Sequence, residues 1–293
     1  MDPHLDGAVK AAIALALVAA CGSNDGRVSI TAWGEEAATV GYPNQELAFA
    51  DAWTLKYDHW ITSLSNIELA DPKTESVAFG DTTNYLADWT QAALPVDVTE
   101  TSMPSGRYKF SYSFVAPSAG ATKVTEVDDA LVAAMITNHW NTYIEATATK
   151  GAETVKLRWG MTNPARYQYC KNGIDNTDGI AVPDGGGVEA GIFVHLDHSF
   201  WDRLGTEEAS LRFDVIAAWA QNGETSLDDL EHVSVANIRG PDDQPILDEQ
   251  GRPLHYDDAG LGLAKLREFI VFSTSQQAHL NGEGQCTRIP IHD

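Results

Sequence analysis

The residues best suited to chemistry stand in one short stretch, His195-Leu196-Asp197-His198. On a β-strand, residues two apart share a face, so His195 and Asp197 are expected to point the same way. If the strand ends at Asp197, the loop that follows could bring His198 round to join them. Imidazole and carboxylate groups that converge in this way are good ligands for zinc, copper or iron. The alternative interpretation is that these histidines lie at the surface or serve in hydrogen bonds.

The C-terminal segment offers further ligands, because His279 and Glu283 are four residues apart. That spacing puts both side chains on one face if a helix extends so far. We therefore predict a site for a transition metal, copper or zinc first. The candidate ligands are His195, Asp197, His198, His279 and Glu283.

The N-terminus is typical of an exported protein. Lys10 precedes an apolar run of ten residues, Ala11–Ala20, and Cys21 follows at once. The sequence Val18-Ala19-Ala20-Cys21 resembles the bacterial lipobox, in which small residues precede a cysteine that is lipidated after cleavage. Acyl chains contribute about 0.8 kcal/mol per buried methylene, so several of them hold a domain firmly on a membrane. The alternative is an ordinary secretory signal followed by a chance cysteine.

This resemblance divides the chain into three parts. We predict a signal peptide over 1–20, the lipidated Cys21 with a tether over 21–28, and one globular domain over 29–293. No Asp follows Cys21, and by resemblance to Gram-negative sorting rules this favours the outer membrane over the inner one. The domain would then face the periplasm or the cell surface.

Two further cysteines, Cys170 and Cys286, are predicted to form a disulfide, because an exported protein meets an oxidising compartment. A bridge that closes a loop of this length contributes on the order of 4–5 kcal/mol in the chain-entropy model. The alternative is two free thiols, one or both of which bind a soft metal.

The composition excludes some classes of protein. The 293 residues include 19 Lys and Arg against 42 Asp and Glu, a formal charge of −23. So acidic a surface repels phosphate backbones, which argues against nucleic acid as a partner. No apolar run reaches the roughly 18 residues of a membrane-spanning helix. The membrane contact that we expect is therefore the N-terminal lipid alone.

Alternation of apolar and polar residues predicts a mainly β fold, a single β-sandwich-like domain with two or three helices packed at one end. The strand-like segments are 52–57, 107–117, 155–159 and 191–198, and residues 247–254 look like a hairpin turn in which Gly251 takes a positive φ. The helical segments are 125–139, 261–280 and a short one from Ser226 to Leu230.

Three segments carry a resemblance to a known group of proteins. His195–Phe213, Trp53–Asp58 and His279–Cys286 resemble a group of exported bacterial lipoproteins without assigned function. A Tyr-x-x-Cys element precedes the histidine segment in that group, as Tyr167 and Cys170 do here. In layout the chain is also distantly similar to periplasmic copper-binding proteins associated with methanobactin operons. That likeness implies copper handling rather than catalysis.

The sequence contains none of the motifs that mark common enzymes, such as Gly-x-Ser-x-Gly, His-Glu-x-x-His or a P-loop. A non-catalytic function is therefore expected. Calcium is an unlikely ion, because the loop 219–230 keeps only Asn222 and Asp229 as strong side-chain donors. The competing function is a surface module that binds glycans or a partner protein through exposed aromatic residues, such as some of the eight tryptophans, and through acidic loops.

Overall fold

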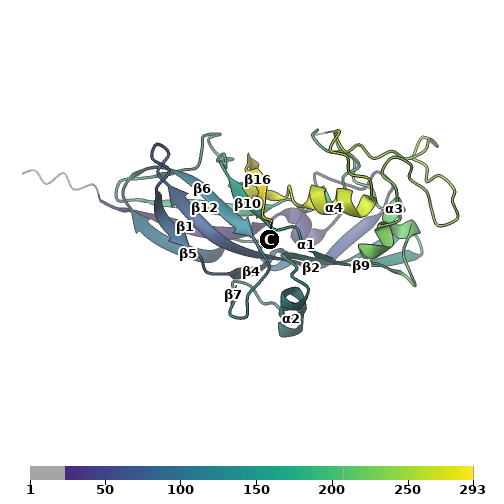
Figure 1. The fold of residues 1–293 in the computed structure, drawn as a ribbon, viewed down its shortest axis with the longest axis horizontal. Coiled ribbons are helices and arrows are strands. Elements are labelled where there is room, and N and C mark those ends of the chain that lie inside the picture. The colour runs from purple at the N-terminus through teal and green to yellow at the C-terminus, as the bar shows by residue number, and fades with distance from the viewer. Residues whose placement is uncertain (1–23, 207, 293) are drawn as a thin grey trace, which may run out of the picture.

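The computed structural model describes residues 24–206 and 208–292. The predicted signal peptide and Cys21 lie outside the described residues. The fold is mainly β, with two sheets and a few helices (Figure 1). The first strand, β1 (Gly26–Gly34), begins three residues before the predicted start of the domain, so part of the expected tether is strand.

The smaller sheet carries the segments that form the candidate site. Its strand order is β15 (Gly284–Gln285), β14 (Ala278–Leu280), β12 (Gly187–Val194), β1 and β5 (Val96–Met103). Strands β1 and β12 are parallel, and Gly34 pairs with Val194 at the end of the ladder. The two residues that follow these strands, Glu35 and His195, therefore leave the sheet side by side.

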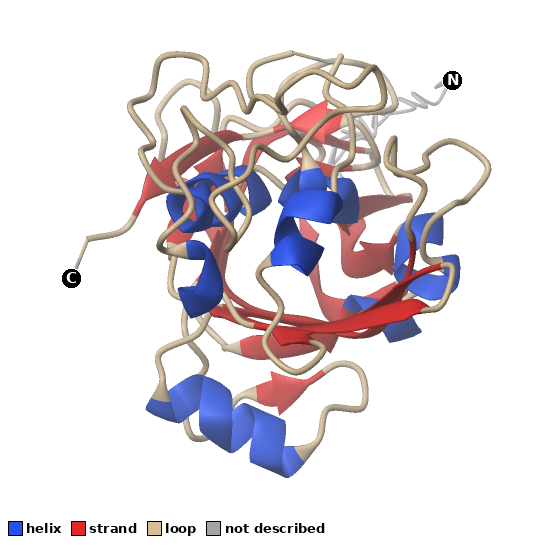
Figure 2. Ribbon diagram, turned by 90° about the vertical axis from the view of Figure 1, so that its right-hand side faces the viewer, coloured by secondary structure: helices blue, strands red, loops and turns tan. Residues whose placement is uncertain are grey.

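The larger sheet curls beneath the helices and loops, as Figure 2 shows. Its main path is β13 (Glu224–Thr225), β9 (Glu153–Met161), β8 (Thr142–Lys150), β2 (Thr54–Ala70), β6 (Gly106–Phe114), β10 (Ala165–Gln168) and β16 (Thr287–Pro290). Beside this path, β3 (Val77–Asp81) and β4 (Tyr85–Asp88) pair with β2, β7 (Thr122–Lys123) pairs with β4, and β11 (Ile180–Val182) pairs with β6.

One apolar core fills the space between the two sheets. Ile30 and Ile192 of the smaller sheet belong to the same buried cluster as Trp60 and Trp159 of the larger one. The alternation predicted for 155–159 is confirmed in β9, where Trp159 faces inward. The strand predicted over 107–117 is β6, which ends at Phe114 and buries Ser111 and Ser113 as well as its aromatic face. Together these contacts make the sandwich-like arrangement that the sequence predicts.

The described helices are short. They are α1 (Glu36–Val40), α2 (Asp129–Thr137), α3 (Asp214–Ala218) and α4 (Leu266–Thr274), with 3-10 turns η1 (Trp89–Gln91), η2 (Leu196–Phe200) and η3 (Asp228–Leu230). Helix α2 lies on the outer face of the larger sheet, below it in Figures 1 and 2, where Met135 belongs to a small buried cluster with Ile61 of β2. It is therefore separate from the helices on the inner side.

Two predicted elements are corrected by the structure. The strand expected over 191–198 ends at Val194, and the chain turns into η2, so Asp197 and His198 lie on a 3-10 turn. The helix expected over 261–280 covers only Leu266–Thr274. It ends there because residues 278–285 form the β14–β15 hairpin, whose turn contains Asn281 and Gly282, both with positive φ.

Two smaller predictions have different outcomes. The hairpin turn at 247–254 is confirmed, since Leu247 bridges Pro253 and Gly251 has a φ of 76°. The short helix expected over 226–230 is a single 3-10 turn, because Asp229 accepts hydrogen bonds from the backbone and hydroxyl of Ser226 and closes a tight local turn.

Candidate metal centre

Three histidines meet at one end of the smaller sheet. His195 follows β12, His198 lies on η2, and His279 lies on β14. One ring nitrogen from each lies within 4.8 Å of the others, and the rings of His195 and His279 have centroids only 4.0 Å apart. The structure thus brings together three of the five predicted ligands in one cluster.

The sheet register explains how His195 and His279 meet. Strand β14 runs antiparallel to β12, and His279 pairs with Phe193. Directly paired residues share a face, and Phe193 is two residues from His195, so His279 lies diagonally across from His195 on that face. The His195 backbone N–H also donates to the Gln277 carbonyl, which extends the ladder by one step.

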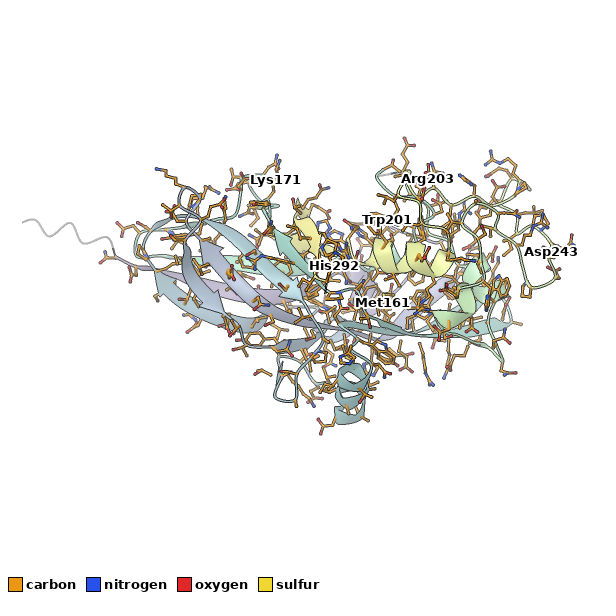
Figure 3. The ribbon with its side chains drawn as sticks, in the orientation of Figure 1. Met161, Lys171, Trp201, Arg203, Asp243 and His292 are labelled. Carbon is orange, nitrogen blue, oxygen red and sulfur yellow. A yellow bond between two sulfur atoms is a disulfide. The ribbon has the colours of Figure 1, made fainter. Side chains whose placement is uncertain are left out.

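His198 is positioned by contacts between η2 and α4. The Ser273 hydroxyl donates to the His198 carbonyl oxygen at 2.6 Å, and Ser199 and Thr274 share a hydroxyl hydrogen bond of 2.7 Å. The indole of Trp201 packs on the imidazole, with ring centroids 3.8 Å apart. Trp201 is labelled in Figure 3, on the side of the molecule that carries α4. These buried contacts fix the backbone from which the His198 ring projects.

The histidine cluster has unused hydrogen-bonding capacity. His195 Nε2, His198 Nδ1 and His279 Nδ1 are buried and have no hydrogen-bond partner. Buried polar atoms are nearly always paired, so three orphaned ring nitrogens in one cluster need an explanation. A metal ion bound by these nitrogens, after His195 Nε2 has lost its proton, supplies one.

Glu35 orients His195, and sequence reasoning missed it. Its Oε1 accepts a hydrogen bond of 2.8 Å from His195 Nδ1, which leaves Nε2 free for a ligand. A carboxylate behind a metal-binding histidine is a common arrangement that fixes the ring and its tautomer. The only signal in the sequence is that Glu35 follows an apolar strand. Its partner is 160 residues away, so the pairing of β1 with β12 had to be known first.

The two other predicted ligands occupy different positions. Glu283 lies in the β14–β15 turn, and its Oε2 is 3.8 Å from His195 Nε2. It belongs to a second group, with Glu35 and His195, that could also hold a metal. Asp197 is in neither group: its Oδ2 accepts from the Trp201 indole at 2.9 Å, and its Oδ1 is buried without a partner. His279 and Glu283 do not share a helix face, because the chain there is a hairpin.

The cluster divides into one charged and two neutral imidazoles. Burial alone disfavours charge on His195, but the hydrogen bond and charge of Glu35, with the charges of Glu283 and Asp197, outweigh it and raise the pKa to about 9. Burial and the charge of His195 lower the pKa of His279 to about 3. Burial, with the same neighbours, also lowers the pKa of His198 well below its usual value. Two neutral imidazoles therefore already have the protonation state of metal ligands.

The carboxyl group of Asp197 has a raised pKa. Burial and the nearby charge of Glu35 raise its pKa to about 6, although the Trp201 hydrogen bond and the charge of His195 act in the opposite direction. Its position beside the histidines makes it part of the electrostatic environment of the site.

A cleft of about 950 Å³ opens from the histidines to the surface. All three histidines line it, and so do five carboxylates, those of Glu35, Glu36, Glu46, Asp197 and Glu283. Among the described lining residues there is no Lys or Arg. Apart from His195, the charged side chains that line the cleft are therefore all acidic, and the cleft favours cations.

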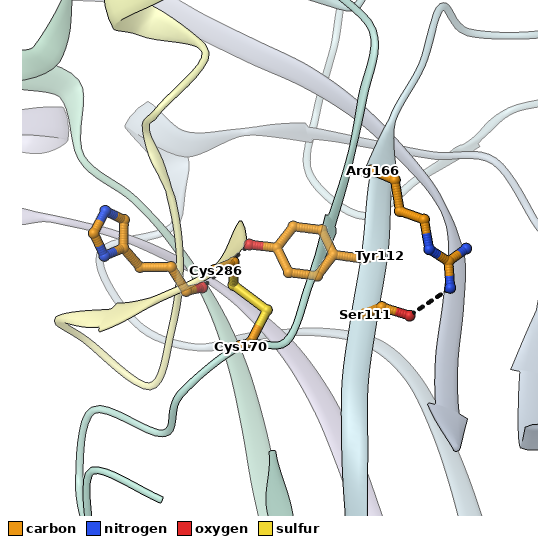
Figure 4. Close-up of a disulfide and its surroundings, with 6 residues drawn as sticks. Ser111, Tyr112, Arg166, Cys170 and Cys286 are labelled. Atoms are coloured by element: carbon orange, nitrogen blue, oxygen red, sulfur yellow. Dashed lines mark hydrogen bonds between the residues drawn. A yellow bond between two sulfur atoms is a disulfide. The ribbon is translucent and has the colours of Figure 1, made fainter. Parts of the chain in front are cut away.

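The predicted disulfide between Cys170 and Cys286 is present. It fastens the segment after β15 to the end of β10, as Figure 4 shows together with Tyr112. The Tyr112 hydroxyl donates to the His279 carbonyl oxygen at 3.2 Å, and the Lys171 N–H donates to the Gln285 carbonyl. The bridge therefore holds the hairpin that carries His279 and Glu283.

Comparisons with family models, curated proteins and solved structures found no match. Within residues 24–206 and 208–292, no helix is long and apolar enough to cross a membrane.

The tryptophans give little support to a glycan-binding platform. Four are fully buried, Trp53, Trp60, Trp89 and Trp159. The other four, Trp33, Trp140, Trp201 and Trp219, are half-buried. A stacking platform for sugar rings requires an open aromatic face. Trp201 presents one of its faces to His198 instead.

Proposed function

We propose that this protein binds one transition-metal ion, copper or zinc, through His195, His198 and His279. The observation that carries the proposal is the set of three buried imidazoles, each with an unpartnered ring nitrogen, with ligand nitrogens within 4.8 Å of one another. Neutral imidazole suits both metals, and copper binds more tightly than zinc to a given nitrogen site. We expect copper to displace zinc.

Metal binding requires at most a small closure of the cluster. Zn–N bonds of about 2.0–2.1 Å place tetrahedral ligands about 3.4 Å apart. The three nitrogens lie within 4.8 Å of one another, so an approach of on the order of 1 Å is sufficient even at that upper limit. His195 must also lose the proton from Nε2, while Glu35 keeps its hold on Nδ1.

The test is elemental analysis of the purified protein after incubation with zinc or copper and removal of the excess. We expect close to one ion per chain. His195→Ala, His198→Ala and His279→Ala should each lower the metal affinity at least a hundredfold, because two imidazoles hold an ion far less firmly than three. The matched control is His255→Ala, an exposed histidine outside the cleft, which should bind as the wild type does. Unchanged metal content in the three cluster variants would contradict the proposal.

We also propose that the protein is an exported lipoprotein of the outer membrane, attached through Cys21, and similar in kind to the exported bacterial lipoproteins that three of its segments resemble. The disulfide supports an oxidising compartment. The lipobox-like sequence supports the anchor, and β1 begins five residues after Cys21.

Metabolic labelling with a palmitate analogue tests the anchor. We expect wild-type protein in the membrane fraction to carry the label, because acylation of the cysteine is the proposed attachment. Cys21→Ser should carry none and should appear in the soluble fraction. Equal labelling of the two forms would refute the assignment of Cys21.

A further inference from the structure

The cleft is much larger than a metal ion needs. A protein site that is purely structural for zinc is closed by four protein ligands, whereas a site that keeps a position for an outside molecule has three. Here three histidines are among the residues that line a cleft of about 950 Å³. His195, His198 and His279 are nine-tenths or more buried, and each has a ring nitrogen without a partner. The fourth position would therefore face the cleft.

The side chains that line the cleft determine whether it favours anionic, neutral or cationic ligands. The five carboxylates and the absence of Lys or Arg among the described lining residues disfavour an anion. Apolar surface is also present, since Leu47 is 37% exposed at the cleft and the half-buried Trp201 lines it. A neutral or cationic donor with an apolar body fits these walls better than a halide, azide or carboxylate does.

We propose that the bound metal keeps one exchangeable coordination position, and that a neutral nitrogen donor from outside the chain, an imidazole or amine group, fills it through the cleft. This inference rests on the proposed metal site and adds the class of ligand. The donor forms one bond to the metal and displaces a water molecule, so no electron transfer and no second reactant are needed.

Glu283 offers the competing arrangement. Its Oε2 is 3.8 Å from His195 Nε2, so a modest movement of the turn could make it the fourth ligand and close the site. Its side chain is 85% exposed and has no other described polar contact. A site closed by Glu283 would exclude outside donors, and a titration can distinguish the two arrangements.

The experiment uses protein loaded with Co²⁺, whose visible absorption reports the ligands around the ion. The loaded protein is titrated with imidazole and, separately, with azide at low ionic strength. Imidazole should change the spectrum in a saturable way and should bind more tightly than azide. An unchanged spectrum with imidazole overturns the proposal. Failure of the protein to take up cobalt, zinc or copper overturns the metal site itself, so the two failures are distinguishable.

Variants of the cleft wall test the role of charge. Glu36 and Glu46 are exposed, line the cleft and belong to neither group of possible ligands. Removing both charges in Glu36→Gln/Glu46→Gln should strengthen azide binding about fivefold, because each carboxylate acts on the anion over several ångströms of water. Imidazole affinity should stay the same. Equal azide affinity in variant and wild type overturns the proposed charge selection.

Discussion

Replacing Cys170 and Cys286 by alanine together is expected to lower the free energy of unfolding by about 2–5 kcal/mol. The two residues are 116 positions apart, so the bridge removes many conformations from the unfolded chain. The folded state should change little, because backbone hydrogen bonds join the two segments on either side. Gln168 pairs with Thr287, and Lys171 donates to Gln285.

Urea unfolding followed by tryptophan fluorescence measures this effect. Alanine is a better replacement than serine because Cys170 is fully buried, where a new hydroxyl would lack a partner. Wild-type protein unfolded with and without a thiol reductant provides the control. The reduced wild type should have the same free energy of unfolding as the double variant. A loss below about 1 kcal/mol in both would show that the bridge does not restrict the unfolded chain as argued.

Raising the pH from 7 to 9 should destabilise the metal-free protein by about 2 kcal/mol through His195 alone. The pKa of His195 is raised to about 9 in the folded state, whereas an unfolded histidine titrates near 6.5. Its contribution to stability is therefore complete below about 6.5 and is lost as the pH rises through 9.

The other groups of the site with shifted pKa values change the stability of the protein mainly below pH 7. The pKa of Asp197 is raised to about 6, so its contribution is already lost above that pH. The pKa of His279 is lowered to about 3, so its contribution is present above about 6.5 and disappears only on acidification. The pKa of His198 is also lowered, so its contribution to stability is likewise lost only on acidification.

Urea unfolding at pH 7, 8 and 9 in the presence of a chelator checks this prediction. Glu35→Gln is the matched variant, because it removes the hydrogen-bonded charge that sustains the His195 proton. The comparison concerns the slopes against pH, so a general loss of stability in the variant does not matter. We expect a decline for the wild type and a nearly flat line for Glu35→Gln. Parallel lines for the two proteins would disprove the role of Glu35.

Local patterns of sequence predicted part of the fold well. Strand β9 buries one face, so alternation in the sequence directly reflects its structure. Strand β6 alternates in the same way, although Ser111 and Ser113 of its polar face are also buried. The segment 261–280 was harder, because apolar residues at helical spacing continue past the end of α4. Pairing with β12 and the Asn281-Gly282 turn override that spacing. Tertiary contacts of this kind do not appear in a local window of sequence.

The candidate site was predictable in its residue types but not in its assembly. His195, His198 and His279 are residues of a type that can bind a metal, and the prediction named all three. Glu35 could not be selected from among 42 acidic residues without the parallel pairing of β1 and β12. Parallel strands are joined through long connections, and nothing near either strand specifies the register.

The wide separation of these residues along the chain has a consequence for the order of folding. Glu35 is 160 residues before His195, and His279 is 84 residues after it. Contacts between such distant segments form late, since closing long loops costs entropy before any contact compensates for it. Strand β14, which carries one of the three imidazoles, must therefore pair with β12 before the cluster exists. A metal ion held by all three imidazoles would bind only after these long-range contacts have formed, and its binding would report that the distant segments have come together.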